Sequence, residues 1–138
     1  MNGRKTTDWS TGSIQNGAMM IHTSYFANLK KLPTGFVPIS ICGKAPEGYR
    51  GIQYKKLAPK YNFFMEWKQT HDNEKYIKCY NEQVLAALDP HEVFAELKTL
   101  SGGRDFVLVC YEKPEDFCHR HLVAKWLVDN GYLCVEYV

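Results

Sequence analysis

Apolar runs of strand length alternate with amphipathic segments along most of this chain. The clearest run, "DFVLVCY" (105–111), is apolar throughout, which is typical of a strand buried on both faces of a parallel sheet. In the next segment, 117–129, apolar residues recur at the three- and four-residue spacing of an amphipathic helix. A further apolar run, "YLCVEYV" (132–138), predicts another strand. We therefore expect a strand–helix–strand unit whose two strands run parallel in one sheet.

The same alternation precedes residue 105. The pattern predicts strands over 18–22 and 36–42, a helical turn or two over 24–32, and helices over 59–70, 76–88 and 89–103. Asp89 and Pro90 are typical of a helix start, and Gly102 and Gly103 of a helix end. Pro38 falls inside the second strand, which favours an edge position or a bulge.

This order of elements predicts the fold class. Strands that alternate with helices indicate an α/β fold, and we expect one three-layer domain over residues 18–138. Its sheet should be mainly parallel, of the Rossmann-like or flavodoxin-like type. Residues 1–17 are polar and without periodicity, so we expect a flexible N-terminal tail there.

Composition narrows the class of protein. The chain of 138 residues is 45% hydrophobic and 14% aromatic, which is typical of a globular domain. No apolar stretch approaches the ~20 residues that span a bilayer, and the N-terminal residues lack the apolar core of a signal peptide. Five scattered cysteines fit a reduced compartment better than a disulfide framework. We therefore expect a cytoplasmic protein without a membrane partner.

Charge is distributed unevenly. Residues 1–80 hold 12 Lys/Arg and 5 Asp/Glu, a balance of +7, whereas residues 81–138 hold 5 and 10, a balance of −5. Solvated helix faces would explain this, but so would a basic wall that attracts an anionic ligand. A sequence pI near 8.2 does not by itself argue for a nucleic-acid partner.

Chemically active side chains gather in "VCYEKPEDFCHRHL" (109–122). Cys110 and Glu112 lie where the predicted strand ends, and Cys118, His119 and Arg120 lie in the first turn of the predicted helix. In open α/β sheets, ligands bind outside the carboxyl ends of the strands. The free N–H groups and the dipole of a helix N-terminus favour an anion there. The sequence therefore predicts an anion site at this turn.

Each residue of the turn suggests a role. Arg120 offers a planar fork for a phosphate or carboxylate, and Asp116 is a candidate N-cap. The helix N-terminus and its cationic neighbours should lower the pKa of the Cys118 thiol, so we expect Cys118 to be accessible, unpaired and nucleophilic. His119 is a candidate general acid or base. Cys110 has a plain alternative as a small core residue.

At these residues the chain resembles a bacterial family known as domain of unknown function 488. The likeness lies in a strand that ends Cys-x-Glu-x-Pro, followed by Cys-His-Arg, and in the N-terminal "IHTSYFANLKKLP" and "YKKLAP". It covers roughly residues 20–130 and implies an α/β fold without a settled activity. The resemblance implies these site residues: Cys110, Glu112, Cys118, His119 and Arg120.

One part of the family's pattern is altered. Many members carry Asp-x-Arg at the end of the second strand, where this chain has "SICGKAP". That part of the family's site is therefore changed here or taken over by Arg50.

Other site types fit the residues less well. A metal site could use Cys110, Cys118, His119 and His121, but the C-x7-C-H-x-H spacing matches no common zinc pattern. A cysteine phosphatase would need a Cys-x5-Arg loop, which is missing here. The phosphate-binding motifs G-x-x-x-x-G-K-[ST] and G-x-G-x-x-G are missing too.

We therefore expect a site for a small phosphorylated or nucleotide-like anion. Cys118 and His119 are the catalytic candidates if hydrolase or transferase chemistry occurs. The ligand-binding candidates are Arg120, Cys110, Glu112, Tyr25, Arg50 and Tyr54. No cofactor is expected. A non-catalytic module that senses or sequesters a nucleotide signal stays open, and so does a metal-binding protein.

Overall fold

A single parallel sheet forms the centre of the molecule. The computed structural model describes residues 20–137, so the tail predicted over residues 1–17 lies outside the described residues. Within residues 20–137 the sheet has five strands in the order β3-β2-β4-β1-β5, and every neighbouring pair is parallel. The strands are β1 Met20–Tyr25, β2 Val37–Ser40, β3 Ile52–Gln53, β4 Phe106–Cys110 and β5 Leu133–Glu136. The α/β class with a parallel sheet is confirmed.

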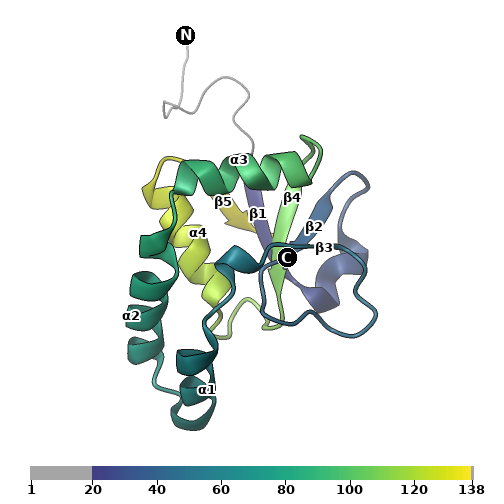
Figure 1. The fold of residues 1–138 in the computed structure, drawn as a ribbon. Helices are drawn as coiled ribbons and strands as arrows, with labels where there is room; N and C mark the ends of the chain where they lie inside the picture. Colours follow the sequence, from purple (N-terminus) through teal and green to yellow (C-terminus); the bar gives the residue numbers. More distant parts are fainter. Residues whose placement is uncertain (1–19, 138) are drawn as a thin grey trace.

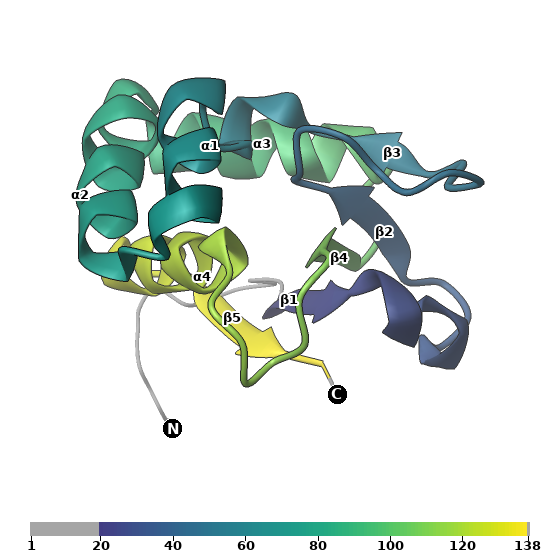
Figure 2. The same ribbon diagram turned by 90° about the horizontal axis from the view of Figure 1, so that it is seen from below.

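The helices cover the two faces of the sheet unequally. The four α-helices of the described residues lie on one face, and the short 3₁₀ helix η1 lies on the other (Figure 1, Figure 2). The α-helices are α1 Tyr61–Thr70, α2 Asn73–Gln83, α3 Pro90–Leu100 and α4 His119–Asp129, and the 3₁₀ helices are η1 Phe26–Lys31, η2 Lys55–Leu57 and η3 Leu85–Ala87. The strand order differs from the 3-2-1-4-5-6 and 2-1-3-4-5 orders of Rossmann and flavodoxin folds. None of the helices between residues 20 and 137 is long and apolar enough to cross a membrane.

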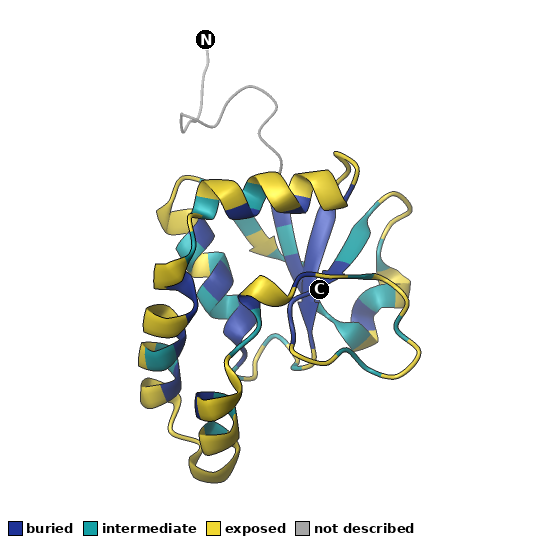
Figure 3. Ribbon diagram, viewed as in Figure 1, coloured by how far each residue is buried: buried dark blue, intermediate teal, exposed yellow. Residues whose placement is uncertain are grey.

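Strand β4 is the most buried element, as its apolar run predicts. All five of its residues are buried (Figure 3), because β1 and β2 flank it and both of its faces are covered. Phe106 and Leu108 belong to the main core cluster beneath the helices. Side chains alternate along a strand, so Cys110 points to the same face. The sequence thus places a thiol at the carboxyl end of the central strand, on the helical side.

The predicted strand–helix–strand unit is confirmed. Strands β4 and β5 are both parallel to β1, which lies between them, and α4 connects them in the chain. The helical turn or two predicted over 24–32 is the 3₁₀ helix η1, residues 26–31. The predicted helix 76–88 begins earlier, at Asn73, and gives way to η3 after Gln83.

Pro38 does not mark an edge strand, contrary to expectation. Strand β2 lies between β3 and β4, with Pro38 opposite Val107. Strand β3 pairs with β2 only at Ile39 and Ser40, so no residue of β3 lies opposite Pro38. The missing N–H of Pro38 therefore costs the sheet no hydrogen bond. The Pro38 carbonyl accepts a hydrogen bond from the Tyr49 hydroxyl at 3.3 Å.

Two helix starts test the predicted caps. The Asp89 side chain accepts a hydrogen bond from the backbone N–H of His91 at 2.9 Å, which confirms it as the cap of α3. Asp116 is not the cap of α4. Cys118 occupies that position and makes no side-chain capping bond, so the first turn of α4 keeps free backbone donors.

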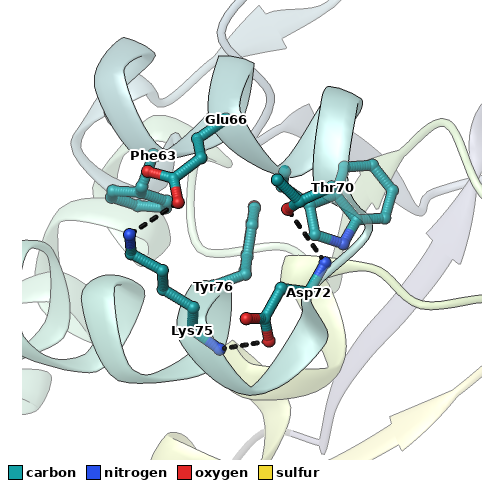
Figure 4. Close-up of a pocket in the computed structure, with 7 residues that line it drawn as sticks. Phe63, Glu66, Thr70, Asp72, Lys75 and Tyr76 are labelled. Atoms are coloured by element: carbon teal, nitrogen blue, oxygen red, sulfur yellow. Dashed lines mark hydrogen bonds and ion pairs between the residues drawn. The ribbon is translucent and has the colours of Figure 1, made fainter.

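Helices α1 and α2 form a hairpin that is closed by polar contacts. Figure 4 shows Lys75 reaching across it to Glu66, with Nζ and Oε2 2.5 Å apart, while Asp72 accepts from the backbone N–H of Lys75 at 3.1 Å. The hollow between the two helices leaves no volume for a water molecule. The space between the two helices therefore offers no room for a ligand.

Candidate functional site

A pocket of about 750 Å³ opens beside the carboxyl end of β4. Its walls come from the segment after β2, from α1 and α2, and from the two ends of the loop between β4 and α4. The lining residues are Cys42, Gly43, Lys44, Pro59, Tyr61, Phe64, Trp67, Lys68, Tyr76, Cys110, Tyr111, Glu112, Phe117, Cys118 and His119. The pocket therefore lies at the edge of the sheet where the sequence predicts a site.

Aromatic rings form one side of the pocket. Phe117 packs edge-on against Tyr76, with centroids 5.0 Å apart, and lies 5.5 Å from the ring of Trp67. Trp67 and Tyr76 are in turn 5.9 Å apart. Mutual packing fixes these three rings, so they offer a preformed apolar surface to a ligand.

Three buried sulfur atoms lie at the floor. Cys42, Cys110 and Cys118 form one cluster, against which Phe26 packs. Cys110 and Cys118 are joined as a disulfide, with Cα atoms 7.6 Å apart, whereas Cys42 is free. Cys118 is therefore buried and paired, which corrects the expectation of an accessible, unpaired thiol. Its position as the N-cap draws it beneath the helix and toward β4.

His119 is also buried at the floor, and its hydrogen bonding fixes its tautomer. Its Nε2 lies 2.7 Å from the carbonyl oxygen of Ile41. A carbonyl only accepts, so Nε2 carries the proton and donates, and Nδ1 keeps a free lone pair. Nδ1 lies 3.9 Å from Cys118 Sγ. Burial, with the charge of Arg120 adding to it, lowers the pKa of His119 to about 4, so the ring is neutral at pH 7.

Arg120 is fully buried and turned away from the pocket lining. Its guanidinium forms a two-point contact with Glu136 of β5, through Nε at 3.1 Å and Nη2 at 2.7 Å. Its Nη1 donates to the Glu112 carbonyl at 2.7 Å and lies 3.1 Å from Cys110 Sγ. These contacts connect the end of β4, the start of α4 and β5. Arg120 therefore holds the site together from behind and does not reach the space where a ligand would lie.

The other predicted ligand-binding residues divide in two. Cys110 and Glu112 line the pocket, as do the catalytic candidates Cys118 and His119. Tyr25, Arg50 and Tyr54 do not. Tyr25 places its ring 5.9 Å from the Arg120 guanidinium, Arg50 is exposed elsewhere, and Tyr54 is buried and donates to the Glu96 carboxylate.

Comparison with known proteins agrees with the likeness noted in the sequence. Residues 28–131 match the family model DUF488-N3a, described as the "Active DUF488-N3 subclade". The chain belongs to the DUF488 family. The matched residues include the whole pocket. No curated protein and no solved structure matches the chain.

In this DUF488 chain, sequence patterns did not reveal the cationic and aromatic parts of the pocket. Lys44 and Lys68 line it, and so do Trp67, Tyr76 and Phe117. Two features of the sequence indicate lysines and aromatic residues in this part of the chain. One is the basic excess of residues 1–80, and the other is the aromatic cluster "YNFFMEW" (61–67). Neither signal shows which side chains face β4.

One group of side chains could hold a metal ion. Among the described residues, the donor atoms of Cys110, Cys118 and His119 all lie within 4.8 Å of one another, and all three residues are buried. His121 stays outside this group, and its Nε2 is buried without a hydrogen-bond partner.

Proposed function

We propose that the pocket binds a small nucleotide-like anion. One observation carries this proposal: an aromatic wall, two lysines and a thiol–imidazole floor border the same pocket of about 750 Å³. That volume is within the range of roughly 300–1,000 Å³ that is usual for small-molecule sites. The wall suits a planar ring, and the lysines suit a phosphate.

In this proposal Lys44 and Lys68 contact the phosphate, the role that the sequence suggests for Arg120. Lys44 and Lys68 are exposed, and Lys68 places its Nζ 5.4 Å from the ring centroid of Phe64. Arg120 is already engaged by Glu136. Lys44 and Lys68 therefore offer free ammonium groups to a phosphate, while Glu112, also in the lining, would disfavour anionic groups on its own side.

Hydrolase or transferase chemistry at the floor is part of the proposal. The free lone pair of His119 Nδ1 can accept a proton, and reduction of the disulfide would make Cys118 a nucleophile. The word "Active" in the description of the matching family model supports this chemistry. With the disulfide closed, Cys118 is masked, and this favours a second candidate function, the holding of the ligand without turnover.

The proposal is tested by calorimetric titration of the full chain with purine and pyrimidine nucleoside monophosphates. Lys44→Ala and Lys68→Ala should each weaken a binding nucleotide about tenfold or more, because a hydrogen bond to a charged group contributes about 1.5–3 kcal/mol. The matched control is Lys113→Ala, which removes an exposed lysine of the loop between β4 and α4 that does not line the pocket. The corresponding nucleosides without phosphate should not respond to any of the three changes.

Two results would contradict the proposal. One is that no nucleotide binds to the reduced or to the oxidised chain. The other is that Lys113→Ala weakens binding as much as Lys44→Ala and Lys68→Ala do.

A cytoplasmic location also belongs to the proposal. It is supported by the three described cysteines that are free: Cys42, Cys79 and Cys134. In a reducing compartment the Cys110–Cys118 pair would also be open for much of the time.

A further inference from the structure

The inner end of the pocket brings together two sulfur atoms and an imidazole nitrogen from two elements. Cys110 ends β4, while Cys118 and His119 begin α4. The folded chain juxtaposes them although seven residues separate the two cysteines and the spacing matches no common zinc motif. Two thiolates and an imidazole are the donor set that Zn²⁺ prefers.

The distances suit one ion. Ligands at the usual Zn–S and Zn–N distances of about 2.3 and 2.0 Å lie roughly 3.5–3.8 Å apart around a tetrahedral centre. Cys118 Sγ and His119 Nδ1 are 3.9 Å apart, and the three donor atoms lie within 4.8 Å of one another. The Cα atoms of the two cysteines are 7.6 Å apart, beyond the roughly 4.4–6.8 Å usual for a disulfide. The backbone thus leaves room for an ion between the two sulfurs once they are reduced.

Neighbouring groups hold the donor atoms of His119 and Cys110 in a form that suits metal binding. His119 donates its Nε2–H to the Ile41 carbonyl at 2.7 Å, so Nδ1 is the bare nitrogen. Metal-binding histidines commonly hold the other ring nitrogen in this way. Arg120 Nη1 lies 3.1 Å from Cys110 Sγ and favours the thiolate, while Glu136 balances the charge of the guanidinium.

We propose that the reduced chain binds one soft divalent cation, with Zn²⁺ as the best fit, through Cys110, Cys118 and His119. Two thiols lose their protons to the solvent as two S–Zn bonds and one N–Zn bond form. The fourth position faces the pocket, the arrangement of zinc sites that act on substrates. The inference deepens the proposed function and rests on it, because the ion would lie where the ligand phosphate or a water molecule enters. While the ion is bound, Cys118 and His119 are its ligands and do not act as nucleophile and base.

The chain cannot bind the metal ion and hold the Cys110–Cys118 disulfide at the same time. The S–S bond must first accept two electrons, and a phosphine or a dithiol supplies them in the experiment. A two-electron oxidant such as hydrogen peroxide, added in the experiment, would take two electrons from the two thiolates, re-form the bond and release the ion. Metal content would therefore follow the redox state of these two cysteines.

The test uses the full chain, reduced with a phosphine, stripped with a chelator, and titrated with Co²⁺ and then Zn²⁺. We expect one Co²⁺ per chain, with thiolate-to-cobalt charge-transfer absorption and the strong visible bands of tetrahedral coordination, both lost when Zn²⁺ displaces cobalt. Cys118→Ser and His119→Ala should weaken Co²⁺ binding by more than about tenfold. The matched control is Cys79→Ser, a free cysteine of α2 outside the donor group, which should bind as the wild type does.

The oxidised wild-type chain is a second control that needs no substitution, and it covers the case in which a variant fails to fold. It should take up no Co²⁺. The proposal is overturned if the reduced chain shows no thiolate–cobalt absorption, or if the oxidised chain or Cys118→Ser shows it in full. Lys44→Ala and Lys68→Ala should leave the cobalt spectrum unchanged. A wild-type chain that binds cobalt as expected but binds no nucleotide would therefore count against the proposed function alone.

Discussion

At the scale of single residues, Arg120 shows how burial decides a role. The sequence favours a ligand contact because a guanidinium near a helix N-terminus suits a phosphate. In the structure the side chain of Arg120 is 0% exposed and that of its partner Glu136 is 21% exposed. A guanidinium in that position needs a carboxylate from the protein itself. We therefore interpret Arg120 as a support that ties β4, α4 and β5 together.

This interpretation predicts a large effect of Glu136→Ala on stability. The substitution leaves a buried guanidinium without its carboxylate, so the free energy of unfolding should fall by about 3–5 kcal/mol in urea. Lys125→Ala is the control within α4, because it removes an exposed pair whose atoms are 2.8 Å apart. It should change the same free energy by no more than about 1 kcal/mol. Equal effects of the two substitutions would show that the buried pair does not support the fold.

At the scale of elements, the connection between β4 and α4 carries most of the site chemistry. The disulfide joins its two ends, Cys110 and Cys118, which are 8 positions apart. Such a bond restricts the unfolded chain, and a loop of this length corresponds to about 2–3 kcal/mol in the chain-entropy account.

Reduction should therefore destabilise the chelator-treated chain. We expect the free energy of unfolding to fall by about 2–3 kcal/mol between the oxidised and the reduced wild type, measured by guanidinium unfolding. The double variant Cys110→Ser, Cys118→Ser should show the same stability under both conditions. A wild type that is equally stable in both states, or a double variant that still responds to the reductant, would contradict this account.

Elements with strong local patterns were predictable, and those decided by neighbours were not. The apolar run of β4 and the Asp89 cap of α3 are local signals, and both are confirmed. Strand β3 is only Ile52–Gln53, which is too short to leave a pattern in the sequence. The N-cap of α4 is Cys118 and not Asp116, because the helix starts later than the periodicity of apolar residues suggests. Pro38 fits an inner strand only because β3 is so short.

At the scale of the whole molecule, the pocket is a product of packing between distant segments. The floor was largely predictable, because Cys110, Cys118 and His119 follow from the strand-to-helix turn. The aromatic side of the pocket was not predictable, because Trp67 reaches the site only through the packing of α1 and α2 against Phe117. Periodicity identifies the inner face of a helix but not the element on which that face packs.

His119 belongs to this scale as well, because it connects parts of the fold that are far apart in the chain. Its ring donates to the Ile41 carbonyl just after β2 and packs 5.6 Å from the ring of Tyr80 in α2. Burial keeps this ring neutral and lowers its pKa from 6.5 to about 4. Its protonation should therefore affect the stability of the whole chain.

The sign of that pH dependence follows from the direction of the pKa shift. Above pH 6.5 the ring is neutral in both the folded and the unfolded chain, so its contribution to stability is fully present. As the pH falls from 6.5 toward 4, the unfolded chain takes up the proton first, and the chain loses about 3 kcal/mol. Urea unfolding of chelator-treated protein should show this loss in the wild type and a clearly smaller one in His119→Gln. His91→Gln, which removes an exposed imidazole from α3, should keep the wild-type dependence. The same acid sensitivity in His119→Gln as in the wild type would mean that other groups cause it and that His119 does not need to stay neutral in the fold.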